Sequence, residues 1–323
     1  MQIFKFSDKN SKKLLILAIF TLIFSLAYLF YGLKLEFLDF FIANRIKKLA
    51  AILLVAYAIG SATMVFQTII NNNIVTPCLL GMNALYLVIH TAIFFFLGSA
   101  NILVTNIYAS FACDILAMSV VASLIYGFLF RVTKYNVLYV LLAGTVMATF
   151  FTSLQKTLVR IMDPADYDML LNSLVASFSH VNTDILGIAF VLTIIVTLIY
   201  KKDLALLDAI ALGKEKAINL GIDYDKTIAR LLLGVVLYIT VATALVGPIS
   251  FLGLIIANLA REIFKTYRHS YLVIGSALVG MVALTAGQFV VERVFVLSIP
   301  IVVFVNIVGG IYFLYLLLKN KGN

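Results

Sequence analysis

Long, nearly uninterrupted apolar runs constrain this chain more than any other feature. A helix needs about twenty apolar residues to cross a bilayer, and runs of about that length recur along the whole sequence. They lie at roughly 14–33, 49–70, 79–97, 107–130, 136–158, 185–200, 227–247, 271–291 and 299–318. Because the runs are continuous and rich in Leu, Ile and Ala, without alternation, they exclude a closed β-barrel. The sequence predicts an all-α polytopic membrane protein.

The composition agrees with this class. Of 323 residues, 63% are hydrophobic and 12% are charged, whereas soluble domains average about 25% charged residues. The net charge of +9 does not indicate nucleic-acid binding, because the 24 Lys and Arg residues are interleaved with apolar spans and form no basic face. Short basic loops on the cytoplasmic side explain the excess. We therefore expect contact with membrane lipid and none with nucleic acid.

Two further segments are too polar or too short to be identified directly as membrane spans. Residues 161–182 are amphipathic and begin at the helix-start signal Asp163-Pro164. Residues 249–261 are apolar but short, and they follow the break at Gly247-Pro248. Irregular backbone inside a membrane is tolerated only where it faces protein or a cavity. We therefore expect the second segment to be a half-crossing or a short helix beside a pathway.

The distribution of basic residues predicts the orientation. If the N-terminus is inside and residues 249–261 cross, the chain makes ten crossings, with 17 Lys and Arg inside against 7 outside. Without that crossing, the basic groups after residue 260 would fall on the wrong side. The positive-inside rule thus predicts about ten transmembrane helices in a single domain, 1–323, with both termini cytoplasmic.

The longest predicted cytoplasmic connection is 201–226. It contains two short helical patterns that are separated by Gly213 and closed by Gly221. Its apolar stripe either packs under the membrane domain or at the interface, or offers a docking surface to a soluble partner. Physical reasoning alone leaves these two readings open.

Several segments match, in order, motifs of one family. LGKEKAINLGI at 212–222 resembles L-G-x-x-x-A-x-x-L-G-[IV], and GPISFLGL at 247–254 matches G-P-I-[GS]-F-x-G-L. QTIINNNIVTPCLLG at 67–81 resembles Q-x4-N-P-L-A-x-P-x-x-L-G, and RIKK at 45–48 resembles R-L-P-R. On these motifs the chain resembles the FecCD family, the permeases of binding-protein-dependent ABC importers for iron–siderophores, haem and cobalamin. The ending, with ERVF at 292–295 and NIVGGIYFLYLLL at 306–318, is similar to the ferric-siderophore (catecholate-type) subgroup.

The resemblance implies the transmembrane permease subunit of an ABC importer that moves a ferric siderophore across the cytoplasmic (inner) membrane of a bacterium. The implied partners are a cytoplasmic ABC ATPase dimer, an extracytoplasmic siderophore-binding protein and a second permease, more readily a different chain than a second copy. The chain would be no enzyme and would hold no cofactor, metal or catalytic residue. ATP-Mg would bind the partner ATPase, in keeping with a sequence that lacks G-x4-G-K-[ST].

The resemblance also assigns residues to three roles. The residues implied to couple the permease to the ATPase are Leu212, Gly213, Glu215, Ala217, Leu220 and Gly221. Docking of the binding protein falls to Arg45, Lys48 and Arg293, which otherwise snorkel to the headgroups. The pathway and its gate include Gln67, Asn72, Pro77, Met147, Gly247 and Pro248. Gln67 and Asn72 have a plainer reading as caps of the second span, and Tyr167 is a further lumen-facing candidate.

Two alternative functions come from the residues themselves. Asp114 is an isolated acid within 107–130, and it could couple ions in a secondary transporter. It also lies near the outer end of its span, and we expect it simply to reach water there. A membrane-embedded enzyme is the third reading, but the spans show no H-E-x-x-H, paired carboxylates or Ser/His pattern suited to catalysis.

Histidine and cysteine add no predicted metal site. His90, His180 and His269 have no ligand-like partner three or four residues away. Cys78 and Cys113 lie in apolar stretches without a pairing pattern, so we expect buried free thiols.

Overall fold

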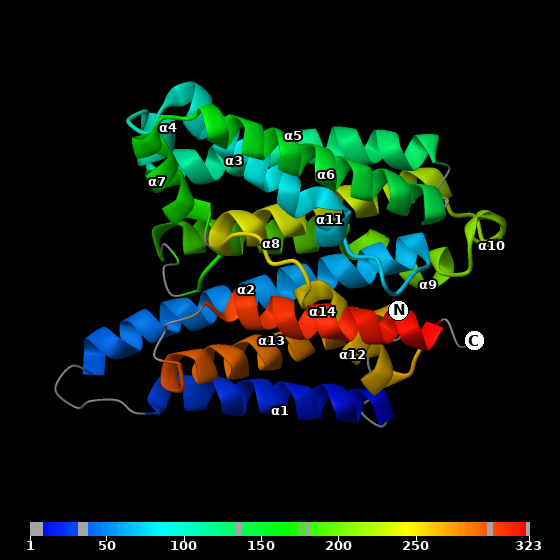
Figure 1. Cartoon of the computed structure of the whole chain (residues 1–323). Helices are drawn as coiled ribbons and strands as arrows, with labels where there is room; N and C mark the ends of the chain where they lie inside the picture. The colour runs from blue at the N-terminus through cyan, green and yellow to red at the C-terminus, as the bar shows by residue number, and fades with distance from the viewer. Residues whose placement is uncertain are drawn as a thin grey trace.

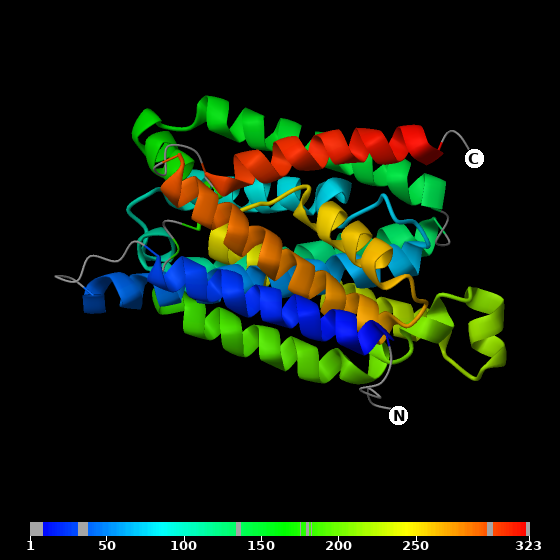
Figure 2. The same ribbon diagram turned by 90° about the horizontal axis from the view of Figure 1, so that it is seen from below.

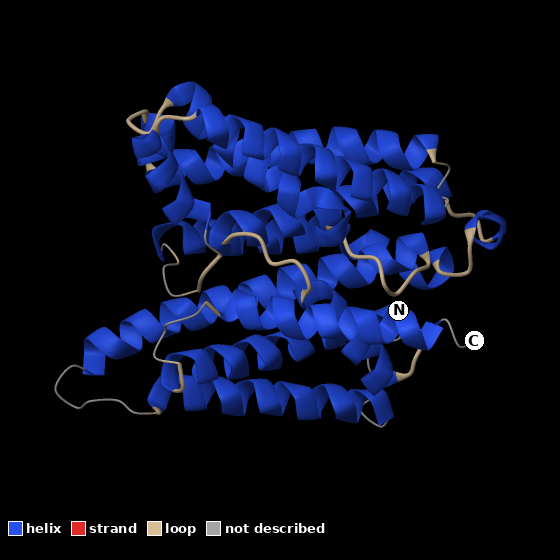
Figure 3. Cartoon of the chain, in the orientation of Figure 1, coloured by secondary structure: helices blue, strands red, loops and turns tan. Residues whose placement is uncertain are grey.

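A computed structural model describes residues 9–31, 38–133, 137–174, 176–178, 181, 183–295 and 300–320. In this part of the chain all regular structure is helical (Figure 3). In order, the elements are α1 (Lys9–Phe30), α2 (Leu38–Ile70), the π-helical turn η2 (Cys78–Met82), α3 (Asn83–Leu97), α4 (Ile102–Thr105), α5 (Ile107–Val132), α6 (Val137–Ile161), α7 (Pro164–Leu174), α8 (Thr183–Leu204), α9 (Leu207–Ile210), α10 (Lys214–Asn219), α11 (Tyr224–Val246), α12 (Leu252–Phe264), α13 (His269–Arg293) and α14 (Ile301–Asn320).

The long helices run roughly side by side as one bundle (Figure 1). Helix α2 lies at the centre and packs against α11 and α13, while α1 covers α13 and α8 covers α11. Burial follows this order: most of α2 and α11 is buried, whereas α1, α6 and α8 expose apolar side chains along their lengths. An apolar outer surface around an apolar core is what a bundle surrounded by lipid requires.

Eight described helices are long and apolar enough to cross a membrane. These spans are Lys9–Phe30, Ile42–Ile70, Cys78–Leu97, Ile107–Val132, Leu138–Ile161, Asp184–Leu204, Tyr224–Val246 and His269–Arg293. The apolar part of α14, Ile301–Leu316, is shorter, and α12 has 13 residues. The predicted all-helical membrane fold is confirmed.

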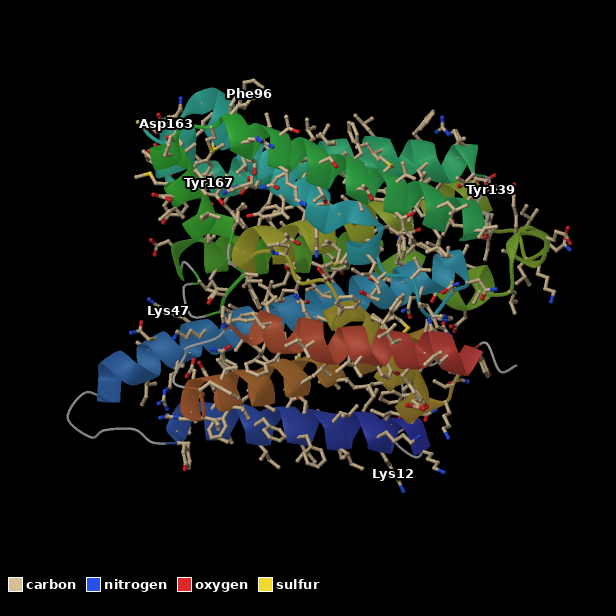
Figure 4. The ribbon with its side chains drawn as sticks, viewed as in Figure 1. Lys12, Lys47, Phe96, Tyr139, Asp163 and Tyr167 are labelled. Carbon is tan, nitrogen blue, oxygen red and sulfur yellow. The ribbon has the colours of Figure 1, made fainter. Side chains whose placement is uncertain are left out.

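The two ends of the bundle differ. The start of α1, the end of α14 and the short helices α9 and α10 lie at one end, called here the α10 end (Figures 1 and 2). Helices α4 and α7 lie at the opposite end, the α7 end. Lys12 lies near the α10 end, and Lys47 and Asp163 lie near the α7 end (Figure 4). His180, and Lys5, Lys34, Lys134 and Lys321 of the charge count, lie outside the described residues.

Several boundaries differ from the sequence prediction or sharpen it. Helix α2 begins at Leu38, so Arg45 and Lys48 lie on the helix and not in a loop before a span starting at residue 49. The charges there lower the local hydropathy, but a helix can continue beyond the hydrocarbon core. The helix start at Asp163-Pro164 is confirmed, because the Asp163 carboxylate accepts from the Ala165 amide at 2.9 Å at the beginning of α7.

The short segment after Gly247 also behaves as expected. The chain leaves α11 as a loop and then forms α12, and together they carry the chain back towards the α10 end (Figure 3). One face of α12 is buried, including Leu252, Leu254 and Ile256. The segment is therefore a short helix packed inside the protein.

Candidate functional site

The predicted loop at 201–226 forms a hairpin of two short helices that projects beyond the bundle (Figure 2). Three of its apolar side chains anchor it: Leu207 and Ile210 on α9 and Ala217 on α10 are buried. Leu212 and Leu220 remain exposed. The packing interpretation of the apolar stripe is therefore confirmed for Leu207, Ile210 and Ala217, while Leu212 and Leu220 face outwards.

Glycine is required at both turns of this hairpin because of backbone conformation. Gly213 has φ 95° and ψ 166° where α10 begins, and Gly221 has φ 80°. Residues other than glycine rarely adopt such backbone angles, because their Cβ atom clashes with the neighbouring backbone. A Cβ at either position would meet no atom within 4 Å, so steric crowding is not the reason. The two glycines set the shape of the hairpin.

Two ion pairs and one hydrogen-bonded Asp–His contact join the hairpin and its flanks to the membrane helices. Lys214 on α10 contacts Asp225 on α11 at 2.9 Å. At the end of α8, the carboxylate of Asp203 accepts two bonds from the guanidinium of Arg230 on α11, at 2.8 and 3.1 Å.

Asp208 on α9 binds the first turn of α13. One carboxylate oxygen lies 2.7 Å from the backbone nitrogen of His269 and 2.7 Å from its Nδ1. With the pair of Lys214 and Asp225, this contact attaches the hairpin to both α11 and α13. A groove of ≈ 590 Å³ lies beside it, between α5, α10 and α11, with Phe130 and Leu232 in its wall and Arg131 at its edge.

Arg45, Lys48 and Arg293 come together at the α7 end, as a common docking role would need. Their donors, however, already serve the fold. The Arg45 guanidinium donates to the carbonyls of Leu29 and Tyr31 at 2.8 and 2.9 Å, which caps α1. Arg293 donates to the same Tyr31 carbonyl at 2.5 Å.

Glu292 completes this cluster. Its carboxylate accepts from the hydroxyl of Tyr28 at 2.8 Å and lies 3.8 Å from the Lys48 ammonium. The cluster therefore ties α1, α2 and α13 together. This structural role was not predicted from the sequence.

The predicted cap at the end of α2 is present. Asn71 adopts a left-handed conformation with φ 53°. The Asn72 amide donates to the Gln67 carbonyl at 3.0 Å, and the Asn72 side chain accepts from the Ile74 amide at 2.8 Å. The Gln67 side-chain amide donates to the Asn73 carbonyl at 2.7 Å. Gln67 and Asn72 thus hold a turn that ends the helix before Pro77, as their plainer reading predicts.

The predicted span at 79–97 contains a break near its start. Pro77 precedes the π-helical turn η2, and Gly81 within it has φ 103°. The Tyr126 hydroxyl on α5 donates to the Leu80 carbonyl at 2.9 Å. This bond satisfies backbone polarity that a buried break would otherwise leave unpaired.

A second break lies at Gly247-Pro248, and it meets the first. Gly247 has φ 86°, and an added Cβ would lie 2.7 Å from the Ala176 Cα. Across the two breaks, the Asn83 side chain donates to the Ser250 hydroxyl at 3.1 Å. The Asn258 side chain on α12 donates to the Asn73 carbonyl at 2.8 Å. The two irregular segments therefore form one connected polar region inside the bundle.

Helix α6 has a row of hydroxyl groups on its exposed side. Thr145, Thr149, Ser153 and Thr157 are four residues apart and all exposed. Thr149 and Thr157 donate to their own helix, at 2.9 Å to the carbonyls of Thr145 and Ser153. Such a row offers little free hydrogen-bonding capacity. Met147 on this helix is half-buried against the core.

Asp114 does not reach water, so that expectation was wrong. Its carboxylate is buried on α5, and it lies 2.9 Å from Nδ1 of His90 on α3. The Nε2 atom of His90 lies 3.0 Å from the Ser173 hydroxyl on α7. The pair therefore brings a histidine next to a serine, although Ser173 lies on α7 and not within a span. Ser173 lies in the last turn of α7, where helix carbonyls rather than amides are left unpaired.

The remaining expectations concern thiols and metals. Both cysteines are free, Cys78 buried and Cys113 half-buried. Within the described ranges, no three His, Cys, Asp or Glu side chains gather closely enough to hold a metal ion. Tyr167 on α7 is half-buried against the small cluster of Phe94, Met162 and Leu170.

Comparison with known proteins identifies the fold and the family. Residues 38–319 match the model of the FecCD transport family. The petrobactin import system permease protein YclO of Bacillus subtilis (strain 168) is 42% identical over 313 residues, which are 97% of this chain and 99% of that protein. The petrobactin import system permease protein FatC of Bacillus anthracis is 29% identical over 280 residues, 87% of this chain and 79% of that protein.

A solved inward-facing conformation of a metal-chelate type ABC transporter has the same fold, with a TM-score of 0.79. It is 23% identical and covers 96% of this chain and 100% of that one. The family model matches residues 38–319, and a 42% identical relative aligns with nearly the whole chain. Together these two findings establish the family. The chain belongs to the FecCD transport family and is a multi-pass permease subunit of a bacterial inner-membrane ABC importer, with its ATPase on a separate subunit.

Proposed function

We propose that this permease carries a ferric siderophore of the petrobactin kind. The observation that carries this proposal is the 42% identity with a petrobactin permease over nearly the full length of both chains. The hydroxyl row on α6 supports it, because a bulky chelate needs a wide passage that binds it weakly. ATP-Mg binds the ATPase, and this chain needs no cofactor of its own.

The proposed topology has ten crossings in a single permease domain, 1–323, with both termini in the cytoplasm. Eight helices provide clear spans, and α12 and α14 provide the other two. The α10 end is then cytoplasmic. Most of the described basic residues belong to helix ends and loops at this end, in keeping with the positive-inside rule.

The α9–α10 hairpin is the proposed contact with the ATPase dimer. Leu212, Glu215 and Leu220 provide exposed apolar and charged groups for that contact, while Gly213 and Gly221 fix the hairpin's shape and buried Ala217 seats it. The ion pair of Lys214 with Asp225 on α11 and the contact of Asp208 with His269 on α13 suit a lever, because a push on the hairpin reaches both helices. Motion of α13 then reaches α12, which packs against it.

The proposed pathway runs along α6 and past the two breaks. Gln67, Asn72 and Pro77 shape the first break, and Gly247 and Pro248 shape the second. Met147 is proposed to face the passage beside the hydroxyl row. A second permease, more readily a different chain than a second copy, would close the passage on its other side.

At the α7 end, Arg45, Lys48 and Arg293 are proposed to face the extracytoplasmic siderophore-binding protein. Their bonds within the chain hold the basic groups at fixed positions. Basic groups around the mouth would also attract an acidic partner or an anionic chelate.

Uptake of radiolabelled ferric petrobactin tests this function in cells that lack the chain and in cells that regain it. We expect uptake to require both the chain and cellular ATP, and to continue under a protonophore while ATP is maintained. Loss of uptake under the protonophore at constant ATP would favour an ion-coupled transporter. If the chain restored uptake of other iron chelates but not of ferric petrobactin, the substrate proposal would be wrong.

A further inference from the structure

A groove on the outer surface of the bundle lies away from the coupling hairpin and the two breaks. It has a volume of ≈ 390 Å³ and is formed by α2, α8 and α13, all three of which are membrane spans. Helices α8 and α13 each pack against α2 and much less against each other, so α2 forms the floor. Leu54 in the floor is buried, whereas Phe190 and Leu198 on α8 are 56% and 65% exposed at the edge. The groove is therefore open to whatever surrounds the spans.

The hydroxyl groups in the groove are already bonded within the protein. The hydroxyl oxygens of Tyr57 on α2 and Thr197 on α8 are 3.0 Å apart, and that of Thr197 also lies 2.9 Å from the Tyr238 hydroxyl on α11. The Thr193 hydroxyl donates to the Ala189 carbonyl of its own helix at 2.8 Å. The other lining side chains are hydrocarbon or thioether groups. An apolar ligand therefore matches the groove better than a polar one.

The groove has the length that one acyl chain can fill. It extends about 10 Å along α2 from Ala50 to Tyr57 and about 12 Å along α8 from Phe190 to Leu198, at the rise of an α-helix. Half of a bilayer's hydrocarbon core is about 15 Å thick. A single chain from one leaflet can therefore occupy the groove.

The position of α8 decides between lipid and protein as the occupant. Helix α8 lies along one side of the bundle, whereas α6 and α14 lie along the opposite side (Figure 2). The proposed passage runs along α6, so the second permease that closes it belongs on that side. The groove beside α8 then faces lipid.

A lysine stands above the groove at the α7 end. Lys47 is exposed on α2, one helical turn before Ala50 and two turns before Leu54, and so on the same side of the helix. Asp184, at the start of α8, is about two and a half turns before Thr193 and therefore on the opposite side of that helix. Lys47 thus places a positive charge above the groove, which complements an anionic headgroup.

We propose that this groove binds an acyl chain of an anionic phospholipid and that Lys47 contacts the phosphate of the same lipid. Lipid tails are as apolar as leucine, so exchanging one tail for another in the groove gains little. The headgroup therefore decides which lipid is held. That this lipid comes from the outer leaflet, and that no second permease covers the groove, rests on the proposed function.

Fluorescence quenching by brominated lipids tests this proposal at a single position, because the chain contains no tryptophan. Phe190→Trp places a reporter at the edge of the groove, and Leu116→Trp, at a 66% exposed position on α5, places one elsewhere on the apolar surface. The purified full chain is reconstituted in mixed bilayers of phosphatidylcholine and phosphatidylglycerol, with bromine on the chains of one lipid at a time. At Phe190→Trp we expect phosphatidylglycerol to associate about fivefold more strongly than phosphatidylcholine, the equivalent of about 1 kcal/mol for one lysine. At Leu116→Trp we expect no preference.

Matched variants in the Phe190→Trp background separate the headgroup from the groove. Lys47→Gln should abolish the preference, Lys47→Arg should keep it, and Lys156→Gln, which removes an exposed lysine near the end of α6, should leave it unchanged. Ala50→Phe fills the floor and should weaken quenching by both lipids. Equal association of the two lipids at Phe190→Trp, or a preference that persists in Lys47→Gln, would overturn the proposal. Uptake of ferric petrobactin tests the proposed function separately, so the two failures are distinguishable.

Discussion

Replacing Gly213 by Ala isolates the role of the hairpin's shape. At φ 95° and ψ 166° the backbone is in a region that only glycine adopts readily. An added Cβ meets no atom within 4 Å, so the whole effect is backbone strain. Such strain costs about 1–3 kcal/mol, which is about 5- to 150-fold in an equilibrium constant. We expect Gly213→Ala to weaken binding of the ATPase by a factor in this range, because the hairpin relaxes to another shape.

Gly98 provides a matched control at the opposite end of the bundle. It has φ 76° and ψ 157°, and its added Cβ also meets nothing within 4 Å. Gly98→Ala should therefore cost similar stability without changing coupling. The assay is the amount of ATPase retained by the purified complex in a dilution series, with ATP-driven uptake measured in parallel. If Gly213→Ala retained the ATPase and transported as well as Gly98→Ala, the hairpin would not be the coupling element.

Three further substitutions test other parts of the account. Gly247→Ala should lower the yield of folded protein and its thermal stability in detergent, because the new methyl group would lie 2.7 Å from the backbone of Ala176; wild-type stability would show that the second break is loosely packed. Tyr126→Phe removes the hydroxyl that binds the Leu80 carbonyl, and we expect a loss of about 1 kcal/mol in chemical unfolding; no loss would mean that water replaces the bond. Arg45→Ala uncaps α1 and should lower the unfolding temperature even without a binding protein, whereas an effect seen only with that partner would assign Arg45 to docking alone.

Features with a local signal were predictable from the sequence. The apolar runs located the spans, and Asp163-Pro164 located the start of α7. Gly213 and Gly221 marked the two turns of the hairpin. In each case a few neighbouring residues determine the structure, through hydropathy, capping or the freedom of glycine at positive φ.

Features that depend on tertiary contacts were not predictable. His90 and Asp114 are 24 positions apart, and Asp208 and His269 are 61 apart. No local pattern joins such residues until the helices pack. The one available hint was Asp114 itself, because an acid within an apolar span needs a partner, and a histidine in the neighbouring span was the nearest candidate.

Two features of helix geometry could not be predicted from hydropathy. The hydropathy pattern does not indicate the break in η2, because the residues around Gly81 are apolar throughout. The sequence pattern also separated Arg45 and Lys48 from the second span, although the helix continues through them. Their bonds to the end of α1 and to Glu292 arise only once α1, α2 and α13 are assembled.

We propose above that the ATPase drives this permease through the α9–α10 hairpin. Photo-crosslinking from Leu220, which is 62% exposed, tests it directly in membranes that contain the whole transporter. A crosslinker at Phe96, which is 75% exposed and near the α7 end, is the control (Figure 4). We expect the crosslinker at Leu220 to form an adduct with the ATPase subunit and the crosslinker at Phe96 to form none. An ATPase adduct from Phe96, or only lipid adducts from Leu220, would contradict it.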